Sequence, residues 1–203
     1  MNFRNRLLRA SKSKKPKDRS ALTIIVSFMW KMISSKLQYS SPFLHVFEDK
    51  IMLPNGEQTI FSRLDMPDFV TVLPITSKKV VMVRNYRYPA NEWFLELPSG
   101  IVEKGEKPEQ CAKRELEEET GYQANLSYVA WYHPSSRSVQ KGHIFLATSL
   151  VNGLPSRDQT EHQRVLTIPA QQIVNKMNEG TLRHAPTVVA LSLCRDYLLS
   201  ETE

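Results

Sequence analysis

The chain has 203 residues, of which 41% are hydrophobic and 24% are charged. This length allows one domain of about 150 residues with its own core, plus a tail, and the composition is ordinary for a globular protein. Two cysteines exclude a scaffold built from disulfides and a cysteine-rich zinc module. No apolar run of the sequence approaches the roughly 20 residues that span a bilayer.

The net charge of +6 is unevenly distributed along the chain. Residues 1–36 hold ten basic residues and one acidic residue, whereas the rest holds 17 basic and 20 acidic residues. The main part of the chain is therefore mildly acidic. A nucleic-acid-binding domain needs its basic charge on a folded face, so the net charge alone does not predict one.

Residues 1–36 are predicted to form a basic tail. Residues 1–20 offer too little apolar surface to offset the entropy of an ordered chain, which predicts disorder there. The apolar run at 21–30 resembles part of a signal sequence or an organellar presequence, but no small-residue cleavage site follows it. We therefore expect a cytoplasmic protein, with an organellar location as the alternative. Contact of the tail with nucleic acid or an anionic membrane is a further alternative.

Several strands are predicted before residue 100. Residues 43–51 and 58–64 alternate between apolar and polar side chains around the turn Leu53-Pro54-Asn55-Gly56, which predicts a two-stranded hairpin. Further strands are predicted at 68–75, 79–84 and 93–97. The last of these ends at the turn Pro98-Ser99-Gly100.

A helix is predicted over 107–120, where Pro108 suits the first turn and Gly121 suits the residue after the end. The remaining predicted elements are strands at 126–132, 143–150 and 165–168, and helices at 169–178 and 186–199. The whole pattern predicts an α/β domain in which helices cover the faces of a mixed sheet.

The predicted helix carries a cluster of glutamates that indicates a metal site. Glu115, Glu118 and Glu119 share one helix face because they are three and four residues apart. Like charges at this spacing destabilise a helix, and the helix dipole disfavours anions near the C-terminus. A divalent cation such as Mg²⁺ or Mn²⁺ would reverse this effect. The alternative is a solvated acidic face with salt bridges from Lys113 and Arg114.

The spacing around this helix resembles the box of the Nudix hydrolases. Gly100 is followed after five residues by Glu106, after seven more by Arg114-Glu115-Leu116, and then by Glu118-Glu119 and Gly121-Tyr122. Every fixed position of the box at 100–122 matches except the last, where Tyr122 stands in place of the small aliphatic residue that the family usually has. A chance match over about nine constraints is negligible.

The resemblance implies an α/β/α sandwich with a mixed β-sheet and hydrolysis of a diphosphate linked to a nucleoside or another organic group. Glu115, Glu118, Glu119 and the backbone carbonyl of Ser99 would bind Mg²⁺ or Mn²⁺. Glu106 would support the loop, and Arg114 would orient the glutamates. Without metal, mutual repulsion should raise the pKa values of the clustered carboxylates.

A second resemblance narrows the family to its ADP-ribose and nucleotide-sugar pyrophosphatase branch. It rests on Val-Arg-Asn-Tyr-Arg-Tyr-Pro at 83–89 and Trp-Phe-Leu-Glu-Leu-Pro-Ser-Gly at 93–100. The branch implies that Arg84 and Arg87 approach phosphate or ribose oxygens, with Glu96 at the edge of the same site. It also implies a small N-terminal antiparallel sheet, which is often exchanged within a homodimer.

The loop at 134–143 departs from the branch. It contains no Asp or Glu, and Gln140 stands about where the branch has an acidic residue that could act as base. Gln cannot take a proton from water, so either a box glutamate is the base, or His143 or Glu161 substitutes, or the chemistry differs. Arg137 and Lys141 make the loop basic, and Arg137 is a candidate substrate contact.

The sequence thus predicts three parts: a tail at 1–36, a strand hairpin and possible dimerisation sheet at 37–66, and a Nudix domain at 67–203. We expect metal-dependent hydrolysis of ADP-ribose or a related nucleoside diphosphate sugar, with a nucleotide as substrate and a homodimer as the assembly. The alternatives are another Nudix substrate, such as a dinucleotide or a capped RNA, and a catalytically impaired nucleotide-binding or regulatory protein.

Removing the tail tests whether it takes part in catalysis. If the function is carried by the Nudix domain, a chain that lacks residues 1–36 should keep its turnover number, because no predicted site residue lies in that segment. Steady-state kinetics of the shortened and the full chain provide the measurement. A large loss of turnover would favour a tail-dependent function.

Overall fold

The computed structural model describes residues 29–153 and 164–200, so most of the predicted tail and the candidate base Glu161 lie outside the described residues. The chain divides into two compact units. One lies within residues 1–39 and 46–63, and the other within 40–45 and 64–203. A small sheet characterises the first unit, and the second is a larger α/β unit.

The small antiparallel sheet has three strands rather than the predicted two. The strands are β1 (Lys31–Ser40), β2 (His45–Met52) and β3 (Gln58–Asp65), in the order β1-β2-β3. β1 begins inside the segment that was assigned to the tail. The sequence does not predict β1 because all ten residues are exposed, so that no alternation of apolar and polar side chains marks the strand. A deletion that tests the tail therefore has to stop at residue 28.

The predicted hairpin between β2 and β3 is confirmed. Its turn has Gly56 at a φ of 88°, in the left-handed region that glycine adopts without steric cost. The Asn55 side chain accepts a hydrogen bond from the Glu57 amide at 3.1 Å, which is a typical turn contact of asparagine.

A mixed seven-stranded sheet forms the larger unit. Its main path runs in the order β10-β5-β4-β9-β8, with β6 paired to β5 and β7 paired to β4. Only β4 and β9 are parallel neighbours among the pairs of this sheet in the described residues. The strands are β4 (Phe69–Thr76), β5 (Lys79–Arg87), β6 (Glu92–Glu96), β7 (Ser99–Ile101), β8 (Tyr122–Tyr132), β9 (Gly142–Asn152) and β10 (Arg164–Pro169). A short 3-10 helix at Tyr88–Ala90 links β5 and β6.

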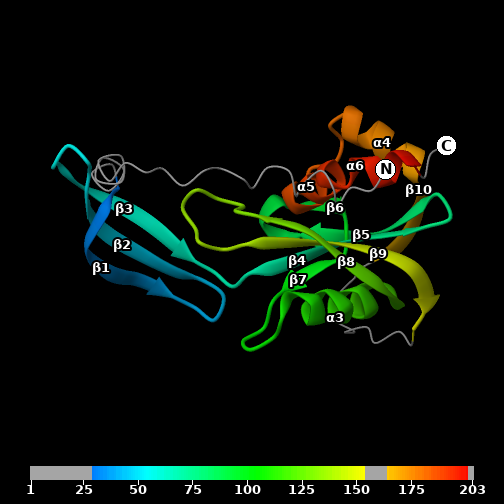
Figure 1. Ribbon diagram of the computed structural model, residues 1–203, viewed down its shortest axis with the longest axis horizontal. Coiled ribbons are helices and arrows are strands. Elements are labelled where there is room, and N and C mark those ends of the chain that lie inside the picture. Colours follow the sequence, from blue (N-terminus) through cyan, green and yellow to red (C-terminus); the bar gives the residue numbers. More distant parts are fainter. Residues whose placement is uncertain (1–28, 154–163, 201–203) are drawn as a thin grey trace, which may run out of the picture. The chain divides into compact units, whose positions relative to one another are not determined.

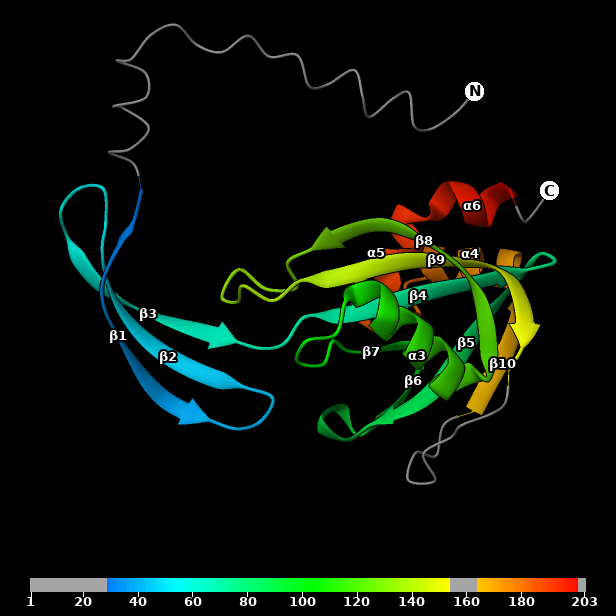
Figure 2. The ribbon, with the colours of Figure 1, turned by 60° about the horizontal axis from the view of Figure 1, so that its bottom comes forward.

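Helices cover both faces of this sheet, so the predicted α/β/α sandwich is confirmed (Figure 1, Figure 2). Helix α3 (Pro108–Thr120) lies on one face. Helices α4 (Ala170–Asn178), α5 (Ala185–Leu193) and α6 (Arg195–Ser200) lie on the other. Throughout the described ranges, each helix is too short or too polar to cross a bilayer.

The single helix predicted over 186–199 is two helices that meet at Cys194. Helix α5 packs against β4, whereas α6 packs against α4. Buried Leu191 and Leu198 join the same apolar layer from the two helices. The sequence continues its apolar pattern across the break and therefore does not show it.

A separate apolar layer packs on each face of the sheet. On one face, Leu116 and Cys111 of α3 lie against Val70 and Val72 of β4. On the other face, the three C-terminal helices bury a larger set that includes Leu73 and Met82. The strand β4 is therefore covered on both sides, which explains its continuous run of buried residues.

The ends of α3 follow the prediction closely. Pro108 is the first helical residue, and the Lys107 amide donates to the side chain of Gln110 at 2.9 Å. Gly121 ends the helix with a φ of 75°, and its amide donates to the Glu117 carbonyl at 2.8 Å. These caps determine which turn of the helix carries each glutamate.

We expect the Asp49→Asn variant to destabilise the small sheet. The buried Asp49 carboxylate accepts hydrogen bonds from Arg63 Nε at 2.7 Å and from Ser35 Oγ at 2.5 Å. The hydrogen bond from Arg63 is the main cause that lowers the Asp49 pKa. Hydrogen bonds to a charged group contribute about 1.5–3 kcal/mol, and Glu48→Gln on the exposed side of β2 is the matched control.

The loss of stability in Asp49→Asn should be larger at neutral pH than in acid. Because folding lowers the Asp49 pKa, its stabilising effect is complete above the ordinary aspartate value of about 4 and disappears as the pH falls through the lowered value. Amide hydrogen exchange of the three strands over a series of pH values from 7 into the acid range provides the measurement. A difference between wild type and Asp49→Asn that does not decrease as the pH falls below about 4 would contradict this interpretation.

Candidate active site

The first part of the site is the segment between β6 and α3. The strand β7 pairs with β4 so that Gly100 lies opposite Val70. The Ser99 amide donates to the Glu119 carboxylate at 3.1 Å. A Cβ atom on Gly100 would lie 1.9 Å from the Cδ atom of Glu115, so the Glu115 carboxylate rests directly on the backbone of Gly100. Only glycine allows this approach.

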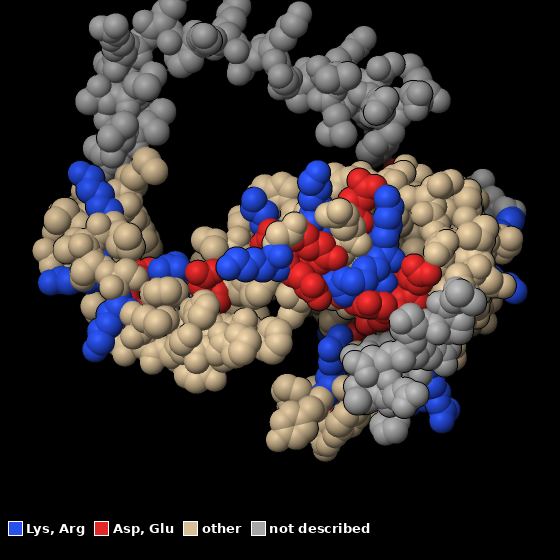
Figure 3. All heavy atoms as spheres, turned by 90° about the horizontal axis from the view of Figure 1, so that it is seen from below, with Lys and Arg blue, Asp and Glu red and all other residues tan. Residues whose placement is uncertain are grey.

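Arg114 joins three carboxylates on this face of the molecule. Its guanidinium donates to both oxygens of Glu106, at 3.0 and 3.1 Å. It also donates to Glu115 at 2.7 Å and to Glu118 at 3.0 Å. A further hydrogen bond, from Nη2 to the Ile101 carbonyl at 3.2 Å, ties the same group to β7. Figure 3 shows acidic side chains gathered on the α3 side, with basic side chains among them.

The electrostatics of this cluster follow the prediction in part. The pKa of Glu115 is raised, but burial is the main cause and repulsion from Glu118 is a smaller one. The pKa of Glu106 is lowered, chiefly by the hydrogen bond from Arg114. Repulsion from Glu118 and Glu106 thus contributes to the raised pKa of Glu115, as predicted, although burial is the larger cause. Glu106 departs from the prediction, because Arg114 compensates part of the negative charge.

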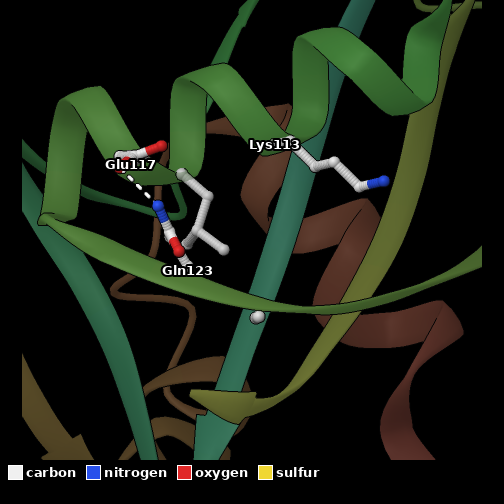
Figure 4. A pocket seen from close by; sticks show the side chains of 5 residues that line it. Lys113, Glu117 and Gln123 are labelled. Carbon is white, nitrogen blue, oxygen red and sulfur yellow. Dashed lines mark hydrogen bonds between the residues drawn. The ribbon is translucent and has the colours of Figure 1, made fainter. Parts of the chain in front are cut away.

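The other glutamates of α3 have structural partners. Glu109 pairs with Lys113 at 2.8 Å on the exposed surface. Glu117 accepts a hydrogen bond from Gln123 of β8 at 2.7 Å (Figure 4). A pocket of about 240 Å³ lies between α3 and β8 and is lined by Lys113, Leu116, Glu117, Gln123 and Ala124. This side of the helix is distinct from the side that carries Arg114, Glu115 and Glu118.

The donor set of the Arg114 side fits a hard divalent cation. Glu106, Glu115 and Glu118 share one guanidinium, so negative charge remains in excess, and Glu115 is only 13% exposed. Within residues 29–153 and 164–200, no three acidic, His or Cys side chains converge closely enough to hold a metal as they stand. Glu115 and Glu118 point to Arg114 instead, and rotation of their side chains would bring carboxylate oxygens to a cation.

Arg87 and Glu96 form a half-buried ion pair beside this segment. Arg87 donates from Nε to Glu96 at 2.8 Å and from Nη2 at 2.5 Å. Glu96 is 1% exposed, whereas the Arg87 side chain is 40% exposed. The two predicted substrate residues are therefore brought together, but Glu96 holds Arg87 in place and only Arg87 presents surface to a ligand.

Arg84 and Arg137 lie in different surroundings. Arg84 is an exposed residue of β5, and its guanidinium lies 5.5 Å from the centre of the Trp93 ring. Arg137 is an exposed residue of the loop between β8 and β9. The backbone carbonyl of Arg137 accepts a hydrogen bond from the Leu64 amide at 2.8 Å.

The loop at 134–143 is held by contacts with the chain before β4. The side chain of Gln140 is buried and donates to the Pro67 carbonyl at 2.5 Å. Asp68 accepts from the Lys141 amide at 2.7 Å and lies 3.2 Å from Nε2 of His143. Nδ1 of His143 is buried and has no hydrogen-bond partner among the described residues. His143 is thus withdrawn from solvent, and Gln140 has a structural role.

Sequence reasoning missed two residues near the half-buried ion pair. The hydroxyl of Thr187 accepts a hydrogen bond from the Leu97 amide at 2.9 Å, and Nδ1 of His184 lies 3.9 Å from the Glu96 carboxylate. No motif marks either residue. Each is about 90 positions from its partner in the sequence, so only the tertiary structure shows the contact.

The family follows from the comparison with known sequences. The NUDIX domain model matches residues 67–189 of the chain. The chain therefore belongs to the NUDIX family, and the prediction made from the box at 100–122 is confirmed.

Individual relatives cover most of the chain. An ADP-ribose pyrophosphatase from Bacillus subtilis is 30% identical over 79% of this chain and 90% of its own length. A methanol dehydrogenase activator from Bacillus methanolicus is 29% identical over 81% of this chain and 91% of its own. A crystal structure of an ADP compounds hydrolase matches the fold with a TM-score of 0.75 at 22% identity, over 85% of this chain and 95% of that one.

We expect the Gly100→Ala variant to fold but to lose most of its activity. The added methyl group would displace the carboxylate at the end of the flexible Glu115 side chain, whereas the backbone of Gly100 can keep its conformation. A displacement of about 1 Å at a catalytic group can cost about 100-fold in rate. Steady-state kinetics and thermal unfolding provide the measurement.

The control for this variant is Gly153→Ala. A Cβ atom there would lie 3.1 Å from both Glu117 Oε1 and the Gly121 carbonyl oxygen on the other side of α3, so it requires a shift of these neighbours but does not displace the Glu115 carboxylate. If Gly100→Ala kept wild-type turnover, or if both variants lost it equally, the Glu115 carboxylate on Gly100 would not be part of the site.

Proposed function

We propose that the protein is a metal-dependent hydrolase that cleaves the diphosphate bond of ADP-ribose or a related nucleoside diphosphate sugar. The products would be a nucleoside monophosphate and a sugar phosphate. The observation that carries the proposal is the cluster in which Arg114 is shared by Glu106, Glu115 and Glu118. The relative from Bacillus subtilis that is named ADP-ribose pyrophosphatase supports the substrate class.

We propose Mg²⁺ as the metal, with Mn²⁺ as an alternative. Glu115, Glu118, Glu119 and the Ser99 carbonyl would hold it, since oxygen ligands suit both ions. A bound divalent cation polarises phosphoryl oxygens, compensates the charge of the leaving phosphate and lowers the pKa of a bound water. In this assignment Arg114 orients Glu115 and Glu118, and Glu106 holds Arg114.

The substrate would contact three arginines. Arg87 is the best supported, because the buried Glu96 fixes its guanidinium and pre-organised donors bind phosphate or ribose oxygens with less loss of entropy. Arg84 and Arg137 are exposed, and each adds positive charge that suits an anionic ligand. Arg84 also has Trp93 beside it, which limits its freedom.

We assign the general base to a box glutamate. Nδ1 of His143 is buried and its other nitrogen faces Asp68, so His143 is poorly placed to take a proton from a water at the site. Gln140 cannot act as a base and is used to hold its loop. Glu118 has a side chain that is 46% exposed, and it lies on the face of α3 that would carry the metal.

We propose a homodimer that uses the small sheet. Each residue of β1 is exposed, and Met32, Ile33, Leu37 and Tyr39 place large apolar side chains on this outer strand. An exposed apolar strand at the edge of a sheet is typical of an interface. We also propose a cytoplasmic location, which suits the two buried free thiols, Cys111 and Cys194. The organellar alternative depends on residues that are mostly outside the described ranges.

A panel of substrates tests the proposal. ADP-ribose, GDP-mannose, UDP-glucose, NADH and dinucleoside polyphosphates would each be incubated with Mg²⁺ or Mn²⁺ and then treated with alkaline phosphatase to release phosphate from the products. We expect metal-dependent turnover of ADP-ribose or of one nucleotide sugar. Turnover of a dinucleotide alone would assign a dinucleotide, instead of a nucleoside diphosphate sugar, as the substrate. No turnover of any compound would favour a binding or regulatory role.

We expect Glu118→Gln to reduce kcat by several orders of magnitude, because the variant loses a charged metal ligand. Its stability without metal should stay close to that of the wild type, since the pair with Arg114 is half exposed and such pairs contribute little. Glu117→Gln on the same helix is the control and should keep its turnover, because Glu117 binds Gln123 on the other side. An active, metal-responsive Glu118→Gln variant would contradict the assignment.

A further inference from the structure

The amide of Leu97 has an unusual hydrogen-bond partner. Leu97 follows the last residue of β6 and is completely buried. Its amide donates to the side-chain oxygen of Thr187, in the first turn of α5, at 2.9 Å. Thr187 is itself completely buried. A buried amide without a partner is costly, so this hydroxyl determines where the chain can leave the sheet.

The same hydroxyl has a second partner. Nδ1 of His184 lies 3.0 Å from Thr187 Oγ1. Burial lowers the pKa of His184, so the neutral ring is favoured and Nδ1 can accept a hydrogen bond. Because the Thr187 oxygen accepts from Leu97, its own hydrogen is available for His184. The Thr187 hydroxyl therefore accepts one hydrogen bond and donates another, which holds the side chain in one rotamer.

The residues on either side of Leu97 belong to the candidate site. Before it, Glu96 holds Arg87. After it, the Pro98 carbonyl accepts from the Val72 amide at 2.9 Å, and the Ser99 amide donates to Glu119 at 3.1 Å. Between these contacts, the Leu97 amide reaches the C-terminal helical layer, on the opposite face of the sheet from α3.

We propose that Thr187 is a positioning residue of the active site, an inference that rests on the proposed function. Its hydroxyl holds the Leu97 amide and thereby sets the path of residues 98–100, which bring the Ser99 carbonyl and the Gly100 backbone to the glutamates of α3. His184 supports it by orienting the hydroxyl. The helix α5 therefore contributes to the site without touching metal or substrate.

Two substitutions of Thr187 distinguish the effect of its hydroxyl from the effect of its side-chain volume. Thr187→Val keeps the shape but removes the hydroxyl, whereas Thr187→Ser keeps the hydroxyl. We expect Thr187→Val to lower kcat for ADP-ribose about tenfold and to raise the Mg²⁺ concentration needed for half-maximal rate. The KM for ADP-ribose should change less, because Glu96 still holds Arg87. Thr187→Ser should restore wild-type values.

A measurement without metal tests the same inference independently of activity. Amide hydrogen exchange of the metal-free protein should be faster at residues 97–101 in Thr187→Val, and unchanged there in Thr187→Ser. If Thr187→Val does not fold, His184→Ala is the second variant, at the residue that caps the N-terminus of α5. It should show the same changes to a smaller extent, because the hydroxyl loses its orienting partner but keeps Leu97.

Val188→Ala is the control for a general loss of stability. Val188 packs against the same apolar layer from α5, and its side chain does not form the hydrogen bond to Leu97. If Val188→Ala, at an equal loss of thermal stability, reproduced the changes in kcat and in metal requirement, a merely structural role of α5 would explain them. Wild-type kinetics and exchange in Thr187→Val would also overturn the inference.

The outcomes distinguish this inference from the proposed function. If the wild type does not hydrolyse ADP-ribose or any other compound of the panel with Mg²⁺ or Mn²⁺, the proposed function fails, and so does the catalytic role of Thr187. If the wild type is active and Thr187→Val equals Thr187→Ser in kcat, metal requirement and exchange, only the role of Thr187 fails.

Discussion

The sharing of Arg114 among Glu106, Glu115 and Glu118 is the interaction on which the site depends. Glu115 and Glu118 on neighbouring turns of α3 repel each other and the nearby Glu106 of the preceding loop, and Glu115 is also partly desolvated against Gly100. One guanidinium with a fixed fork of donors reduces this repulsion and also ties α3 to the Ile101 carbonyl of β7. The excess of negative charge that remains is what suits the face to a divalent cation.

The short segment from Glu96 to Gly100 connects the parts of the larger unit. It leaves β6 at the half-buried ion pair with Arg87, crosses to β4 through Pro98 and meets the glutamates of α3 at Ser99 and Gly100. The Leu97 amide, the Pro98 carbonyl and the Ser99 amide each have a hydrogen-bond partner on a different element. Local hydrogen bonding of this kind fixes the position of a turn more firmly than its own sequence would.

The sequence predicted the helix α3 and the hairpin of β2 and β3 because their signals are local. Pro108, Gly121 and Asn55-Gly56 act within a few residues, and their conformations are those expected. The strand β1 was missed because it has no buried face. The break at Cys194 was missed because it depends on packing against α4, which an apolar pattern does not express.

The sequence by itself determined the family, and it predicted metal-dependent chemistry at the box, since the spacing of Gly100, Glu106, Arg114 and the glutamates places them on one loop and one helix face. The tertiary structure decided how the other candidates are used. It buried Glu96 beneath Arg87, withdrew His143 behind Asp68 and brought Thr187 to Leu97. These contacts join residues that are distant in the chain or on different strands, so no local pattern encodes them, and they form only when the sheet and its two helical layers pack together.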